Sequence, residues 1–186
     1  MGSLRVLTLA LLLGGSAMAQ SGPTYGIGRA PSAEEIRASD ISVSSTGAEL
    51  PPGRGTSKEG AQIFAQKCAA CHGKTGTEGR APVLKGKAEP TTDTWARGRI
   101  LPIRAPFATT VWDYINRAMP LNREGTLTAD EVYALTAFLL HINDVIPEDQ
   151  ILDAQSLPKV KMPIGDAYAS LPDWKPKTRR LQGYPY

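Results

Sequence analysis

Cys68-Ala69-Ala70-Cys71-His72 is the stretch that decides how this chain of 186 residues folds. Its two thiols lie three positions apart, on one side of a helical turn, and a histidine follows directly. Cys-x-x-Cys-His is the pattern that attaches a c-type haem. Each thiol can form a thioether with one vinyl group of the porphyrin, and the histidine is placed to ligate the iron. The motif therefore predicts one covalently attached haem c, held by Cys68, Cys71 and His72.

Three other chemistries compete for these residues. A thioredoxin-like redox pair belongs near a βαβ pattern, which the flanks lack, and nothing in that interpretation requires the adjacent histidine. A zinc site would need His141, the only other histidine, at a separation that fits no common zinc module. A disulfide across two intervening residues is sterically poor. The haem interpretation accounts for all three side chains.

The first 19 residues have the layout of a secretory signal peptide. A basic Arg5 precedes an apolar run from Val6 to Leu13, and Ala17-Met18-Ala19 forms an A-x-A cleavage site. The run is too short to span a bilayer, although an uncleaved anchor is an alternative. We expect a periplasmic or otherwise exported protein with no membrane span after cleavage. The formal net charge of +3 is too weak to imply nucleic acid as a partner.

The rest of the chain divides into a central domain and two arms. Residues 20–55 are rich in Gly, Pro and Ser and predict an extended N-terminal arm, with a short helix at 33–37 after Ser32. Residues 56–146 carry the haem motif and predict the folded domain. Residues 147–186 hold six prolines with little periodicity, which indicates a second, proline-rich arm.

Three amphipathic helices are expected in the central domain. Thr56 and Glu59 fit a capping box that starts a helix leading into the motif. A loop follows over 73–90. A second helix is expected over 108–118, ending before Pro120. A third begins after Thr128 and ends near Asn143. The domain is thus mostly α, with three or more helices around one haem.

Two methionines outside the leader could supply the second axial ligand. Met119 lies between two helices, 47 residues after His72, and Pro120 would rigidify the loop that presents its sulfur. We predict Met119 as the ligand, with a core-filling role as the alternative. For Met162 the core role is favoured. His141 is a bis-histidine alternative, but it lies off the apolar stripe of its helix and fits a solvated helix end better.

The order of these features resembles a class I cytochrome c. It runs from Gly60 and Phe64 through the haem motif, Pro82 and Met119-Pro120 to Leu135-x-x-Phe138. The resemblance implies that the first and last helices cross near Gly60 and that Phe64 packs on Phe138. It also implies that the Pro82 carbonyl accepts a hydrogen bond from the other ring nitrogen of His72.

A narrower resemblance covers most of the chain. It is to the cytochrome subunits of sulfite and sulfane dehydrogenases, the Sox-type and Sor-type partners of molybdenum enzymes. The segments that carry it are 25–29, 50–53, 110–120, 127–136 and 157–163. It implies an electron-transfer subunit, not itself an enzyme, that takes single electrons from a molybdenum dehydrogenase to a downstream acceptor. Some members have two haem domains and this chain has one, and residues 40–47 carry little charge, which leaves the exact partner open.

Two other functions remain as alternatives. One is a haem enzyme or ligand-binding sensor with an exchangeable sixth ligand, and the other is a free-standing general electron carrier. Outside the haem site, three arginines could bind the haem propionates or an anionic partner, or simply be solvated: Arg97, Arg99 and Arg104. Trp95, Trp112 and Tyr114 are expected to line the haem crevice. The basic, aromatic segment 157–186 could order on a partner or pack on its own domain.

Overall fold

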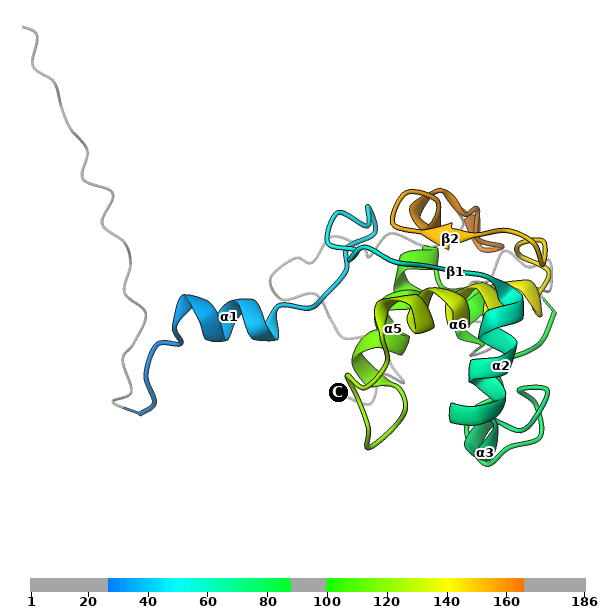
Figure 1. The fold of residues 1–186 in the computed structure, drawn as a ribbon, viewed down its shortest axis with the longest axis horizontal. Helices are drawn as coiled ribbons and strands as arrows, with labels where there is room; N and C mark the ends of the chain where they lie inside the picture. The colour runs from blue at the N-terminus through cyan, green and yellow to red at the C-terminus, as the bar shows by residue number, and fades with distance from the viewer. Residues whose placement is uncertain (1–26, 88–99, 166–186) are drawn as a thin grey trace, which may run out of the picture.

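The computed structural model describes residues 27–87 and 100–165, and these form a mostly helical protein (Figure 1). The helices are α1 (Ala33–Ser39), α2 (Ser57–Lys67), α3 (Ala69–His72), α4 (Leu101–Arg104), α5 (Ala108–Ala118), α6 (Ala129–His141) and the 3-10 helix η1 (Leu157–Lys159). Two short strands, β1 (Arg54–Gly55) and β2 (Leu152–Asp153), pair antiparallel. The leader and three of the residues singled out above lie outside the described residues: Trp95, Arg97 and Arg99.

The helices begin and end close to where the sequence predicts. Both expected caps of the haem domain are complete capping boxes: Thr56 with Glu59 starts α2, and Thr128 with Glu131 starts α6. In each, the threonine hydroxyl accepts from the backbone N–H three residues on, and the glutamate reaches back to the N-cap. Ser32 caps α1 in the same way. These caps use backbone donors that the first turn of a helix leaves unpaired.

Helices α2 and α6 cross at Gly60, as the class I resemblance implies. A Cβ atom on Gly60 would overlap the carbonyl oxygen of Ala134, so only glycine allows this approach. Beyond the crossing point the rings of Phe64 and Phe138 pack with their centroids 5.0 Å apart. This crossing fixes the end of α2 that leads into the haem motif.

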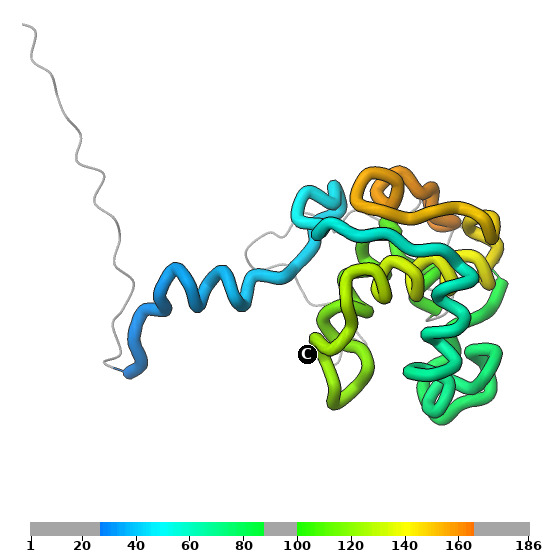
Figure 2. The backbone as a smooth tube through the Cα atoms, viewed as in Figure 1, coloured from blue at the N-terminus to red at the C-terminus, as the bar shows by residue number. Residues whose placement is uncertain are grey.

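Residues 147–165 correct the predicted boundaries, because they pack against the domain instead of forming an arm. β2 pairs with β1, and four apolar side chains are buried in the common core: Leu152, Leu157, Met162 and Ile164. In Figures 1 and 2 this segment forms a layer over α6. Residues 147–165 therefore belong to the packed body, although the sequence predicts an arm that starts at residue 147. The buried positions follow neither a helical nor a strand period, so the sequence carries no periodic signal for them. Met162 is a core residue, as predicted.

The N-terminal arm separates from the body near residue 43. The backbone N–H of Val43 donates to Oδ1 of Asp113 at 2.9 Å, and Leu50 is buried in the core. Residues 27–42 are exposed, and α1 extends away from the body (Figure 2). Within the described residues, no helix is long and apolar enough to cross a membrane.

Candidate haem site

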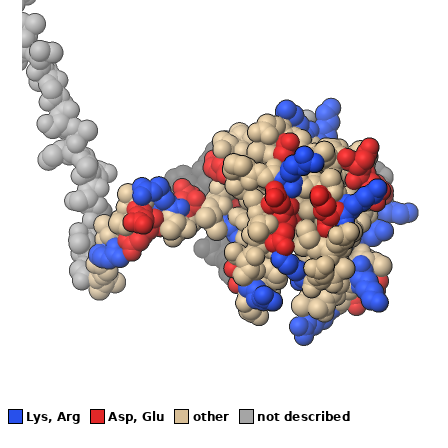
Figure 3. Space-filling model, in the orientation of Figure 1, with Lys and Arg blue, Asp and Glu red and all other residues tan. Residues whose placement is uncertain are grey.

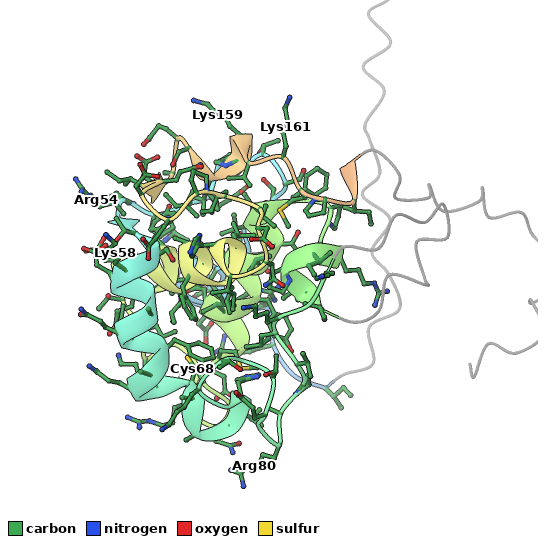
Figure 4. All side chains as sticks on the ribbon, turned by 90° about the vertical axis from the view of Figure 1, so that its right-hand side faces the viewer. Arg54, Lys58, Cys68, Arg80, Lys159 and Lys161 are labelled. Carbon is green, nitrogen blue, oxygen red and sulfur yellow. The ribbon has the colours of Figure 1, made fainter. Side chains whose placement is uncertain are left out.

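The two cysteines lie at and just after the C-terminal end of helix α2. Cys68 is the C-cap of α2, and the short helix α3 carries Cys71 and His72. Both thiols are free, and burial raises the pKa of the Cys68 thiol to about 11. Figure 4 places Cys68 near one end of the molecule and Lys159 and Lys161 at the opposite end. The layer formed by residues 147–165 therefore lies away from the site.

The imidazole of His72 is oriented by a backbone carbonyl. Its Nδ1 lies 2.9 Å from the carbonyl oxygen of Pro82, as expected from the class I resemblance. A carbonyl can only accept, so Nδ1 carries the proton and donates it. The lone pair of the neutral ring then lies on Nε2, which is free to bind a metal.

The loop after the motif folds back onto the motif. This arrangement depends on Gly79, which the sequence pattern does not single out. The N–H of Ala81 donates to the carbonyl of Cys71 at 2.9 Å, one residue before Pro82. A Cβ atom on Gly79 would overlap that same Cys71 carbonyl oxygen. The backbone of the loop thus lies directly against the motif. Spacing alone could not single out Gly79 among the many glycines of this loop.

Met119 follows the last residue of α5 and is half-buried. Its N–H donates to the carbonyl of Ile115 at 3.1 Å, and its side chain packs against the edge of the hydrophobic core. In Figure 1 the loop that begins at Met119 and helix α3 lie on the same side of α6. The two elements that carry the predicted axial ligands, α3 and the loop after α5, therefore lie on one side of α6.

The donor set and its surroundings fit a haem. The site supplies two thiols, an imidazole with Nε2 free and a thioether, which are the groups a c-type haem uses. The core also has a border of apolar side chains that are only partly covered, including Leu84, Leu101, Met119, Leu127, Phe138 and Ile142. An incompletely covered apolar border suits a large apolar ring.

Among the described residues the zinc alternative has no ligand set, and His141 has a backbone partner of its own. Nδ1 of His141 lies 3.3 Å from the carbonyl oxygen of Ile146, at the end of α6. Over residues 27–87 and 100–165, no group of three or more His, Cys, Asp or Glu side chains could hold a metal ion. The zinc interpretation thus has no ligand set in this part of the chain.

The aromatic side chains of α5 lie in two different environments. Trp112 is buried against Tyr133, with ring centroids 5.5 Å apart, and borders a cavity of about 350 Å³ near the root of the arm. Tyr114 is exposed on the surface of α5. Their predicted contact with the haem stays a prediction.

Comparison with known proteins identifies the class. The family model of cytochrome c matches residues 57–143, close to the predicted domain of 56–146. The chain belongs to the class I cytochromes c, whose cofactor is a covalently bound haem c. It is also similar to a chain in the crystal structure of the sulfane dehydrogenase SoxCD from Paracoccus pantotrophus. That match has a TM-score of 0.66 and 30% sequence identity, and covers 86% of this chain and 85% of that one. A search of curated protein sequences found no match.

Proposed function

We propose that this protein is an exported monohaem cytochrome that transfers single electrons at a closed, six-coordinate iron. Cys68 and Cys71 would hold the haem through thioethers, and His72 Nε2 and the Met119 sulfur would ligate its iron. The bound haem supplies an iron that changes its charge by one electron. The observation that carries the proposal is the hydrogen bond from His72 Nδ1 to the carbonyl oxygen of Pro82, because it places the proton of the neutral ring on Nδ1 and the lone pair on Nε2.

The protein's own residues determine how that iron behaves. The Pro82 carbonyl keeps the His72 ring in one tautomer and one orientation. A thioether ligand is neutral and favours the reduced iron, which raises the reduction potential. Met119 packs against the hydrophobic core and is partly buried, which agrees with a sulfur ligand that water does not readily replace.

Exchange of the sixth ligand separates this proposal from a haem enzyme or sensor. We expect the purified protein to be low-spin and to bind carbon monoxide poorly when reduced. Met119→Ala should produce a high-spin component that binds carbon monoxide readily. Met162→Leu, which alters a core methionine, is the matched control and should leave the spectrum unchanged. Ready binding of carbon monoxide by the unaltered protein would favour the enzyme or sensor.

The similarity to SoxCD supports a sulfur-oxidising molybdenum dehydrogenase as the electron donor. The similarity covers 86% of the chain, whereas the cytochrome c family model matches only residues 57–143. It therefore includes residues outside the haem domain, which a general electron carrier would not need. We infer a dedicated partner that oxidises sulfite or sulfane sulfur, and a separate downstream acceptor. Export to the periplasm agrees with the leader-like first 19 residues.

The N-terminal arm supports the same partner. Ile27, Ile36 and Ile41 are 86%, 52% and 48% exposed, on a segment whose helix α1 has no buried residue. These three exposed isoleucines lie within 15 residues on a projecting segment, and burying them against a partner would be favourable. Figure 3 shows basic and acidic side chains together on the arm. The arm therefore has no surface of a single charge that would favour a strongly charged partner. We infer that the arm binds the dehydrogenase subunit.

Rapid mixing tests the partner. The oxidised cytochrome is mixed with a candidate molybdenum dehydrogenase and sulfite, and haem reduction is followed by its absorbance. We expect fast reduction that requires both the enzyme and the substrate, and co-elution of the two proteins on size exclusion. Absence of reduction with either sulfite or a sulfane substrate would remove the sulfur assignment and leave the cytochrome assignment intact.

A further inference from the structure

Asn143 lies just beyond the end of α6, and its buried side chain binds the backbone of a distant loop. Its Nδ2 donates to the carbonyl oxygens of Leu139 at 2.7 Å and Leu84 at 2.9 Å. Its Oδ1 accepts from the N–H of Gly86 at 2.9 Å. Both N–H donors of the amide and its oxygen are therefore used. Asn143 thus binds the carbonyl of Leu84 and the N–H of Gly86, two residues later. A neighbouring β-strand would make the same pair of hydrogen bonds.

The loop that Asn143 holds is the one that orients His72. Pro82 lies between Ala81, which is tied to the carbonyl of Cys71, and Leu84, which Asn143 binds. The N–H of Leu84 also donates to the carbonyl of Gly76 at 2.8 Å. The Asn143 contacts fix this loop to the end of α6, whereas the bonds to Cys71 and Gly76 join it to neighbouring sequence. A loop tied to a packed helix opens less often than one tied only to itself.

We propose that Asn143 is a positioning residue for the haem-ligating histidine. By fixing Leu84 and Gly86 to the end of α6, it holds the Pro82 carbonyl where that oxygen accepts the Nδ1 proton of His72. The inference rests on the proposed role of His72 as an iron ligand. A positioning role differs from a packing role because the Asn143 side chain acts through its hydrogen bonds. An apolar side chain of the same volume would not make these bonds.

Two substitutions distinguish the effect of the Asn143 hydrogen bonds from the effect of its side-chain volume. Asn143→Asp keeps the size and the acceptor for Gly86, but it turns an anionic oxygen toward the carbonyls of Leu84 and Leu139. Asn143→Leu keeps the approximate volume and leaves three backbone groups without their partner. In the full haem-containing chain, NMR measures how fast the Nδ1 proton of His72 exchanges with solvent. We expect the exchange to accelerate at least about tenfold in both variants, because the loop opens more often.

Tyr133→Phe is the control for a general loss of stability. It removes a hydrogen bond of 2.9 Å from the Tyr133 hydroxyl to the carbonyl of Pro51, which ties α6 to a different segment. We expect the His72 exchange rate to stay unchanged in this variant. An unchanged rate in both Asn143 variants, or an equal acceleration in Tyr133→Phe, would overturn the proposal.

A measurement on the unaltered chain decides the matter if the variants do not fold. The amide proton of Gly86 and the Nδ1 proton of His72 should be released by the same opening, so their exchange rates should depend on denaturant in the same way. Different dependences would overturn the positioning role. Absence of a paramagnetic shift of the His72 ring in the oxidised protein would instead overturn the proposed ligation, so the two failures are distinguishable.

Discussion

Two backbone contacts determine what His72 can do. The Pro82 carbonyl sets the tautomer of the ring, and the close approach at Gly79 sets where the loop carrying Pro82 lies. Neither contact involves a second reactive side chain. The chemistry of the ligand thus depends on residues whose own side chains are unreactive.

Gly79→Ala tests the close approach. The added methyl group overlaps the Cys71 carbonyl, and backbone on both sides cannot yield without displacing Pro82. We expect a loss of about 1–3 kcal/mol in the free energy of unfolding and a smaller fraction of chains that carry haem. Urea unfolding and the ratio of haem absorbance to protein measure the two effects.

Gly125→Ala is the control for this substitution. Gly125 has a φ of +72° with no atom within 4 Å of an added Cβ, so alanine there meets only the left-handed backbone penalty of about 1 kcal/mol. Its haem content should be normal. Normal haem content and stability in Gly79→Ala would show that the loop does not need this approach.

Tyr133 makes the free energy of unfolding depend on pH in the alkaline range. Burial raises the pKa of its hydroxyl from the ordinary 10.0 to about 12. The folded state therefore binds this proton more tightly than the unfolded state, and the resulting stability is complete below pH 10 and lost as pH rises toward 12. Tyr133→Phe should cost about 1 kcal/mol near neutral pH, from the lost bond to Pro51.

Denaturant unfolding followed by circular dichroism measures this effect. The stability difference between the parent and Tyr133→Phe should shrink as pH rises through that window, because only the parent has a hydroxyl to ionise. A difference that stays constant over the window would contradict the assignment to Tyr133.

Among elements, the crossing of α2 and α6 determines where the haem motif lies. Gly60→Ala should cost about 3 kcal/mol, because the new methyl group meets the Ala134 carbonyl and forces the helices apart. Thermal and urea unfolding measure the loss. Ala65→Gly, at an exposed position of the same helix, should cost only about 1 kcal/mol from helix propensity. Equal losses in the two variants would mean that the close crossing does not matter.

The positions of helices can be predicted from the sequence where the signal comes from neighbouring residues. The capping box at Thr56, the cap at Thr128 and the apolar stripes locate α2, α5 and α6, because caps and helical periodicity are set by neighbouring residues. The packing of residues 147–165 was not predictable in this way. Leu152 and Leu157 are buried by contacts with distant residues, and their spacing follows no regular period. The role of Asn143 is not predictable for the same reason, since its two loop partners, Leu84 and Gly86, lie almost 60 residues away.

At the scale of the whole molecule, the haem domain and the arm have separable roles. Ile36→Asp should weaken binding to the dehydrogenase at least about tenfold, because a charge replaces an apolar contact at the interface. Its free energy of unfolding should change by less than about 0.5 kcal/mol, since α1 has no buried residue. Binding is measured by calorimetry, and the reduction potential should stay unchanged.

Ala38→Asp places the same charge on α1 and is the matched control. It should bind the partner much more tightly than Ile36→Asp does. If both variants bind as the parent does, the arm takes no part in the complex, and the partner must be recognised by the haem domain alone.

The most direct test of the account is the NMR signal of the methionine methyl groups in the reduced, haem-containing protein. A methyl group on an iron-ligating sulfur lies against the porphyrin face, whose ring current shifts its resonance strongly upfield. We predict one such signal, absent in Met119→Ala and retained in Met162→Leu. A shifted signal that disappears in Met162→Leu, or no shifted methionine methyl at all, would contradict the closed His72–Met119 site.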